Sequence, residues 1–157
     1  MRKRKLSLDF NATKARDSEA EITGTDFAKA ISKLAEDKLA GALTVETVGE
    51  SDGFINVSPT LCAHVIMAVL SLAEPDDLMH MTVTLSNTMR MEIHHRRTID
   101  TEDLAKIISF AATCGLAVER FEGGVAFSTE IRHSELLKIY AGSASDFVKN
   151  LENIFDL

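Results

Sequence analysis

The chain has little of several residue types, and each shortage excludes a class of protein. Its two cysteines, Cys62 and Cys114, have no CxxC spacing, which argues against a disulfide framework or a cysteine zinc motif. Apolar runs such as "VIMAVL" are too short to cross a bilayer, and "MRKRKLSLDF" lacks the apolar segment of a signal peptide. We therefore expect a cytoplasmic protein without a membrane partner.

Positive charge is also scarce, since 17 Lys and Arg residues stand against 24 Asp and Glu, a net charge of -7. Binding to nucleic acid needs a concentrated basic face, so we expect no nucleic-acid partner. The one reservation is the basic cluster of Arg2, Lys3, Arg4 and Lys5. Such a cluster could touch RNA, an acidic partner or a membrane surface, although a short basic terminus is more often a solvated tail.

What the chain does contain is ordinary for one globular domain, with 45% hydrophobic and 26% charged residues. We expect residues 1–24 to form a basic tail, a short strand in "LSLDF" and a polar link. Residues 25–157 are then predicted to form a single domain. Helices are predicted over 134–157, where Phe147, Leu151, Ile154 and Phe155 form a stripe that docks on the domain or on a partner.

Start and stop signals predict three further helices. The first runs from Asp26 to Ala40 with Thr25 as its N-cap, and the second follows Ser58, with proline at its first position. The third begins after Asp100 and ends at Gly115, which suits the left-handed residue beyond a helix.

Alternating segments predict the strands of a sheet. "ALTVETV" and "GFINV" are expected to be joined across "GESDG", "MTVTL" and "MRMEIHH" across "SNT", and a last hairpin turns around Gly123 and Gly124. The central hairpin places its methionines on one face, which packs on helices or, alternatively, offers an adaptable contact surface. These elements predict an α+β fold, a two-layer sandwich with a mostly antiparallel sheet and helices on one face.

Two histidines and a carboxylate form a candidate metal site. In the register expected for the central hairpin, His80 lies opposite His94, and Glu92 is two residues along on the same face. This set can bind zinc or another transition metal. A register shift of one residue would separate the three side chains. His95 points to the other side of the strand from His94 and is not expected to share an ion with it.

Several motifs resemble one known family. In "INVSPTLCAHVIMAVLSLA" a strand leads into Ser58 and Pro59, and the helix that follows has the hydrophobic spacing of the family form Q-V-L-x-N-L-x-x-N-A. "MTVTLSNTMRMEIHH" resembles the family's paired central strands, and "GLAVERFEGGVAFSTEI" resembles its final hairpin. Over about residues 43–132 the chain thus resembles the ATP-binding catalytic domain of bacterial sensor histidine kinases, within the GHKL superfamily. The resemblance implies a histidine-kinase-like ATPase fold.

The nucleotide-binding residues of that family are absent at the matching positions. The helix asparagine that holds magnesium and phosphates falls at Leu72, an earlier asparagine falls at Ala68, and neither residue offers a side-chain oxygen. The aspartate that binds adenine falls near His94 or His95, with no glycine after it. "RRTIDTEDLAK" passes directly from strand to helix, without space for an ATP lid. We therefore predict no cofactor and no catalytic residue.

The resulting hypothesis is a non-catalytic domain of this kind, acting as a regulatory or protein-interaction module in bacterial signalling. A protein partner is expected, with the methionine-rich hairpin and the end helix as candidate surfaces, and a homodimer is a further hypothesis. Two alternatives stay open. One is a nucleotide-binding relative of the anti-sigma-factor serine kinases, and the other is a small metal-binding protein that uses His80, Glu92 and His94.

Overall fold

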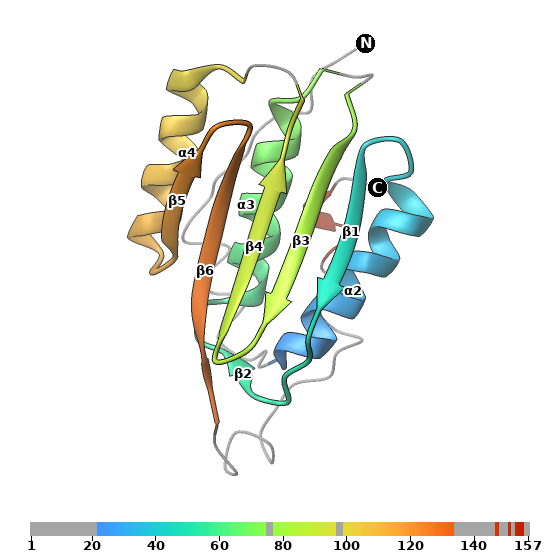
Figure 1. The fold of residues 1–157 in the computed structure, drawn as a ribbon, viewed down its shortest axis with the longest axis vertical. Helices are drawn as coiled ribbons and strands as arrows, with labels where there is room; N and C mark the ends of the chain where they lie inside the picture. Colours follow the sequence, from blue (N-terminus) through green and yellow to red (C-terminus); the bar gives the residue numbers. More distant parts are fainter. Residues whose placement is uncertain are drawn as a thin grey trace.

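The computed structural model describes residues 22–74, 77–96, 99–133, 147, 151 and 153–155 (Figure 1). Its helices are α2 (Gly24–Lys38), α3 (Pro59–Ser71) and α4 (Thr101–Thr113). Its strands are β1 (Leu43–Val48), β2 (Phe54–Ile55), β3 (Met79–Leu85), β4 (Thr88–His94), β5 (Ala117–Phe121) and β6 (Gly124–Arg132). The basic tail, the short strand expected in "LSLDF" and the helix expected at "SELLKIY" lie outside the described residues.

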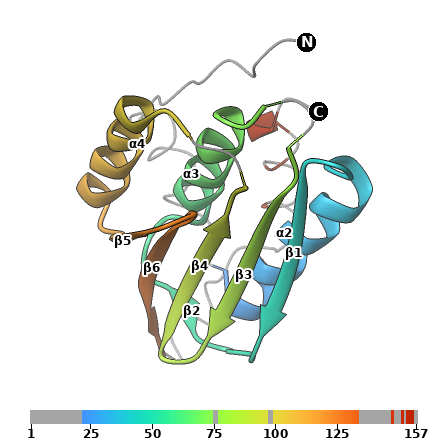
Figure 2. The same cartoon turned by 45° about the horizontal axis from the view of Figure 1, so that its top comes forward.

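The strands form one mixed sheet in the order β1-β3-β4-β6-β2, with β5 also paired to β6. Only β1 and β3 are parallel among the described pairs, and the other pairs are antiparallel. All three labelled helices lie behind the sheet in Figure 1, and Figure 2 shows α3 between α4 and α2. The predicted two-layer α+β sandwich with a mostly antiparallel sheet is confirmed.

The central hairpin has the register that the sequence predicted, with Leu85 opposite Met89. Its apolar face is fully inside the sandwich, because Met81, Met89 and Met91 are at most 1% exposed. The methionines therefore belong to the core, as a sheet packed on helices requires. The idea that the methionine face of this hairpin is an adaptable contact surface is wrong.

The first two strands are not joined as a hairpin, contrary to the expectation for "GESDG". β1 lies parallel to β3, while Phe54 and Ile55 of β2 pair with the far end of β6. Two parallel neighbours need a long crossover connection, and α3 supplies it between β1 and β3. The chain turns away from β1 at Gly49, whose φ is +82°, and a Cβ there would collide with the carbonyl oxygen of Leu85.

The helix starts follow their capping signals with one correction. The Oγ of Ser58 accepts the Leu61 amide at 3.1 Å, and Asp100 caps α4 in the same way. Helix α2 begins two residues earlier than predicted, because Thr23 is its N-cap. Thr25 instead accepts the Ser51 amide at 2.7 Å and ties the helix to the loop after β1. A tertiary hydrogen bond thus overrides the local signal at Thr25.

The C-terminal stripe is packed against the domain. Phe147, Leu151, Ile154 and Phe155 are all buried, and the Phe147 ring lies 5.4 Å from the Phe27 ring of α2. Of the two occupants that the sequence allowed for this stripe, the domain itself is confirmed. An apolar stripe used in this way is not available as a docking surface for a partner.

Helices α3 and α2 differ in how much of their surface is buried. Twelve of the 13 residues of α3 are buried, whereas six of the 15 residues of α2 are. A helix that is apolar on all sides belongs in the interior, and "PTLCAHVIMAVLS" is such a sequence. The single buried face of α2 leaves a polar face toward solvent, beside β1.

Candidate functional site

Helix α3 carries the first group of positions singled out by the resemblance. Ala68 is completely buried, and Leu72 forms the C-cap and packs partly buried against the core. Between them, the Ser71 hydroxyl donates to the Ala68 carbonyl at 2.6 Å, so this nearby oxygen is engaged within the helix. These three residues present alkyl groups and one satisfied hydroxyl, which is a poor set of ligands for magnesium or phosphate.

The end of β4 carries the second group. His94 lies on the open face of the sheet, where its Nε2 is 2.9 Å from Glu92 Oε1 and its ring lies 5.3 Å from the Phe121 ring. The His95 amide donates to the Gly123 carbonyl at 2.9 Å. This backbone bond extends the β4–β6 pairing by one residue into the β5–β6 turn. His94 is thus held by neighbours on the face opposite to the helices, and it does not point toward α3.

A hollow of about 410 Å³ lies next to His95, between the end of β4, the start of α4 and the β5–β6 turn. Arg96 and Arg120 line it together with Glu122. Neither Ala68 nor Leu72 lines this hollow, so it does not connect the α3 positions with the end of β4. Residues 95–100 are all that separates β4 from α4, which confirms the direct passage from strand to helix.

Glu92 is shared by two neighbours. Its carboxylate lies 3.4 Å from Arg90 Nε and 2.9 Å from His94. Arg90 also contacts Glu119 of β5 at 2.9 Å. The hydrogen bond with Glu119, followed by that with Glu92, raises the pKa of the Arg90 guanidinium. This network joins β4 to β5 across β6 on the open face of the sheet.

The candidate metal residues are brought onto one face in the predicted register. His80 stands opposite His94 in the β3–β4 pair, and its Nδ1 bonds to the Thr44 hydroxyl of β1. Within the described ranges, no three His, Cys, Asp or Glu side chains are spaced to hold a metal ion as they stand. Zinc binding by His80, Glu92 and His94 stays a prediction, which a zinc-dependent melting temperature would test.

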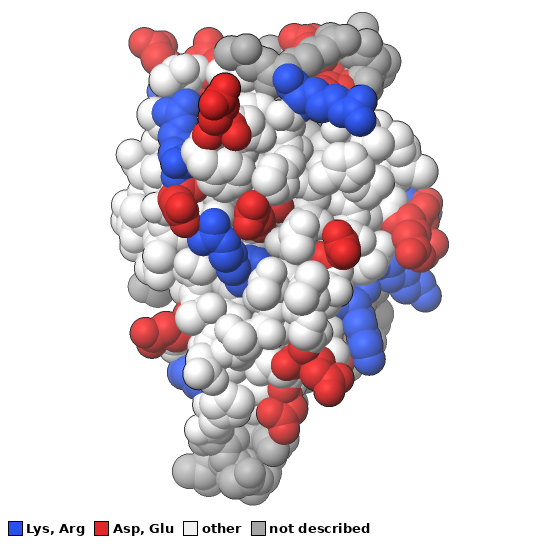
Figure 3. Space-filling model, in the orientation of Figure 1, with Lys and Arg blue, Asp and Glu red and all other residues white. Residues whose placement is uncertain are grey.

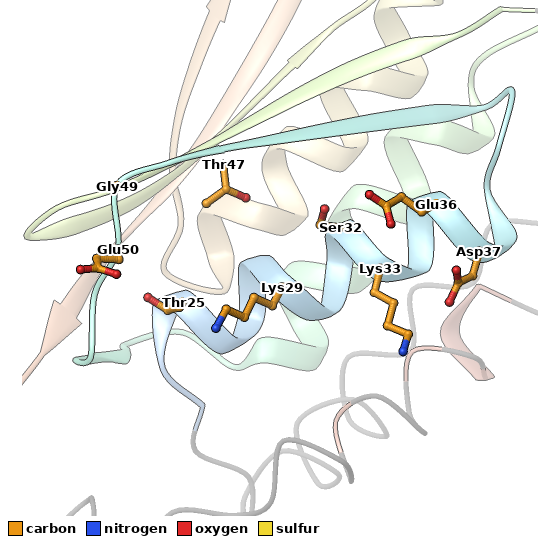
Figure 4. Close-up of a pocket in the computed structure, with 9 residues that line it drawn as sticks. All are labelled: Thr25, Lys29, Ser32, Lys33, Glu36, Asp37, Thr47, Gly49 and Glu50. Carbon is orange, nitrogen blue, oxygen red and sulfur yellow. The ribbon is translucent and has the colours of Figure 1, made fainter.

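A groove that the sequence did not predict runs between α2 and β1; we call it the β1 groove (Figure 4). Its first part, of about 630 Å³, is lined by Thr25, Lys29, Ser32, Lys33, Glu36 and Asp37 of α2, and by Thr47, Gly49 and Glu50. Figure 4 shows Thr47 above the helix, with Ser32 and Glu36 directed toward the strand. The polar face of α2 is visible in the sequence. The groove could not be predicted from it, because the sequence does not show that β1 ends the sheet beside this face.

The β1 groove continues into a second hollow of about 840 Å³. The two parts share Thr25 and Glu50, so they form one continuous depression. Asp26, Asp52 and His133 line the second part, and His133 Nδ1 lies 3.9 Å from Asp52 Oδ1. The combined groove therefore extends along β1 and around the lower end of the sheet.

The open face of the sheet is mixed in charge. Figure 3 views this face and shows acidic and basic side chains interspersed among neutral ones, without a continuous basic stripe over its described part.

Among the described helices, none is both long and apolar enough to span a bilayer.

Comparison with known proteins gives matches only among solved structures. No family model matches the chain, and no curated protein matches it. The chain is similar to the Acinetobacter baumannii histidine kinase AdeS, with 12% identity, a TM-score of 0.45, and coverage of 78% of this chain and 72% of that chain. It is also similar to the histidine kinase domain of the Erythrobacter litoralis EL346 blue-light activated histidine kinase (16% identity, TM-score 0.40, 79% and 73% covered). A third match is the mycobacterial sensor histidine kinase MprB (10% identity, TM-score 0.40, 74% and 99% covered).

All three of these proteins are histidine kinases, the family that the sequence resembles. At such identities and TM-scores the likeness carries no inference about activity. The α+β sandwich is defined by the pairing of the chain's own strands and the packing of its own helices.

Proposed function

We propose that this chain is a non-catalytic, histidine-kinase-like domain that acts as a regulatory or protein-interaction module in signalling. The observation that carries the proposal is the burial of α3. Ala68, at the place of the earlier asparagine of the resembled family, is 0% exposed. Leu72, at the place of the asparagine that holds magnesium and phosphates in that family, packs partly buried against the core. A nucleotide site needs oxygen ligands and open space at that helix, and the buried methyl group supplies neither.

The end of β4 supports the same proposal. His94 is occupied by Glu92 and Phe121 on the open face, and the His95 amide is used by the β5–β6 turn. The six positions 95–100 leave little chain for a lid over a nucleotide. Phosphoryl transfer depends on positioning metal, phosphates and base together, so the loss of all three positions favours a role without chemistry.

The alternative of a nucleotide-binding relative of the anti-sigma-factor kinases is separated from this proposal by calorimetric titration. Full-length protein is titrated with ATP and with ADP, each with and without magnesium. We expect no saturable heat at millimolar nucleotide. A dissociation constant in the micromolar range would overturn the proposal and favour the alternative.

A homodimer stays a prediction, and the structure changes how it is tested. Removing residues 143–157 would take away buried core side chains such as Phe147 and Leu151, so a loss of folding would obscure any change in association. Size-exclusion chromatography with light scattering on the whole chain avoids this problem. A strict monomer would remove the dimer hypothesis.

A further inference from the structure

We propose that the β1 groove binds an extended, basic peptide segment of a partner protein, which adds as a strand along the outer edge of β1. The inference rests on the proposed function and names its partner class. It would give the module a recognition mode in which main-chain hydrogen bonds supply affinity and side-chain contacts supply specificity.

The outer edge of β1 offers backbone groups for hydrogen bonding. This strand stands at one end of the sheet order, and among the described strands only β3 pairs with it. The Met79 amide donates to the Ala42 carbonyl at 3.0 Å. Because peptide groups alternate sides along a strand, the N–H and C=O groups of Val45 and Thr47 face outward. An added strand would pair with these groups.

The edge of β1 has little of the protection that natural edge strands carry. Such strands are blunted by charged side chains, above all lysine, by proline or by bulges. The strand "LTVETV" contains no lysine or proline, and its one charge, Glu46, is negative and suits a basic partner. Four of its six residues are exposed, and Val48, at 47%, is the exposed large hydrophobic residue of the described chain. Six residues span about 20 Å, which is enough for a partner strand of ordinary length.

Helix α2 makes one wall of a groove beside the edge of β1. Its polar face lies below β1, and the first and second hollows are continuous through Thr25 and Glu50. A strand added beside β1 would place every second side chain over this wall. The side chains that line the groove would therefore contact every second residue of the partner strand.

The charge of the lining selects the partner's chemistry. The carboxylates outnumber the ammonium groups, with Asp26, Glu36, Asp37, Glu50 and Asp52 against Lys29 and Lys33. This surplus is part of the net charge of -7 on the whole chain. The negative field attracts a cationic segment and raises its rate of encounter. Basic residues at alternate positions of the partner strand would face the carboxylates.

A synthetic peptide tests the inference on the full-length chain. The probe is fluorescein-labelled Lys-Val-Lys-Val-Lys-Val-Lys, and its binding is followed by fluorescence anisotropy at low salt, where surface charges are least screened. Two matched peptides separate the causes. One has glutamate in place of lysine, and the other carries N-methyl groups on every second residue so that one edge cannot donate. We expect each to bind at least about tenfold more weakly.

Two variants of the protein locate the binding. Thr47→Pro removes an outward N–H that the ladder with β3 does not use, and we expect about tenfold weaker binding with an unchanged circular-dichroism spectrum. Glu36→Lys reverses one groove charge and should weaken binding about three- to tenfold. Glu122→Lys makes the same change outside the groove, at the β5–β6 turn, and should leave binding unchanged. Glu36→Lys keeps the test decisive if Thr47→Pro fails to fold.

Equal binding of the lysine and glutamate peptides, or indifference to both Thr47→Pro and Glu36→Lys, would overturn the inference. A chain lacking residues 1–10 checks the source of the basic segment, since Arg2–Lys5 have the same chemistry. Unchanged affinity supports a partner in trans, and about tenfold tighter binding would show that the chain's own tail competes and would overturn that assignment. Nucleotide binding by calorimetry would refute the proposed function while leaving these results intact.

Discussion

Helix α3 and helix α2 pack beneath the same sheet but present different surfaces. Helix α3 is enclosed, so that even Ala68 and Ser71 in its last turns are buried. Helix α2 buries one face through residues such as Phe27 and Ile31, while Lys29 and Glu36 line a groove at the sheet edge. The helix that carries the nucleotide-binding asparagines in the resembled family is therefore core in this chain. The polar recesses among the described residues lie at the rim of the sandwich.

The largest effect is expected where α2 meets the C-terminal residues. Phe147→Ala removes a ring that is 1% exposed and stacked on Phe27, and large-to-small changes of this kind cost about 3–5 kcal/mol in the free energy of unfolding. Urea denaturation measures the loss. Lys29→Ala on the exposed face of α2 is the control and should change stability by less than about 0.5 kcal/mol. A loss below about 1 kcal/mol at Phe147 would mean that the C-terminal residues do not stabilise the domain.

An asparagine on α3, as in the resembled family, tests most directly whether the two helices differ in burial. Ala68→Asn introduces an amide into a fully buried position, and we expect a loss of about 2–4 kcal/mol from overpacking and an unpaired polar group. Ser32→Asn in the groove wall of α2 should cost less than about 1 kcal/mol. If Ala68→Asn were neutral in urea denaturation and gained ATP binding, α3 would have room for a nucleotide after all.

Loss of the N-cap hydroxyl should destabilise α3 and α2 by similar amounts, because the cap hydrogen bond depends little on how deeply the helix is buried. Ser58→Ala and Thr23→Ala each remove a hydroxyl that accepts an amide at 3.1 Å, and each should cost about 1 kcal/mol in thermal or urea unfolding. Ser58→Asp and Thr23→Ser keep an acceptor and serve as controls. Unequal losses, with one near zero, would show that the local caps are not formed as described.

The smallest effect concerns the two thiols. Cys62 is completely buried in α3, whereas Cys114 is half-buried at the end of α4, where burial raises the pKa of its thiol. A raised folded-state pKa means that the unfolded chain loses this proton first. The free energy of unfolding should therefore fall slightly as pH rises through the ordinary thiol range. Cys114→Ser should remove that part of the slope, and iodoacetamide should modify native Cys114 more slowly than a free thiol.

Local sequence signals predicted where helices and strands lie better than which strands pair with each other. Ser58, Asp100 and Gly115 marked helix ends that the structure confirms, because capping depends on neighbouring residues. The central register followed from alternation and a short turn. The parallel pairing of β1 with β3 depends on a long crossover, so nothing within "ALTVETV" indicated it.

In the candidate sites, too, the sequence predicted what depends on strand register and missed what depends on tertiary packing. The sequence placed His80 opposite His94 because that is a matter of strand register, but it gave no sign that Glu92 would be shared with Arg90. The β1 groove depends on tertiary facts, namely which strand ends the sheet and which face of α2 lies beside it. Its residues are ordinary surface residues until those facts are known.

Amide chemical shifts of the full-length protein show whether α3 and the end of β4 hold a nucleotide. We expect ATP with magnesium at millimolar concentration to leave the amides of Ala68, Leu72, His94 and His95 unmoved. We expect the Lys-Val peptide to shift amides of β1 and of the groove face of α2. Saturable shifts at Ala68 and Leu72 with micromolar nucleotide would refute a non-catalytic domain, because they would place a working nucleotide site where the structure has core.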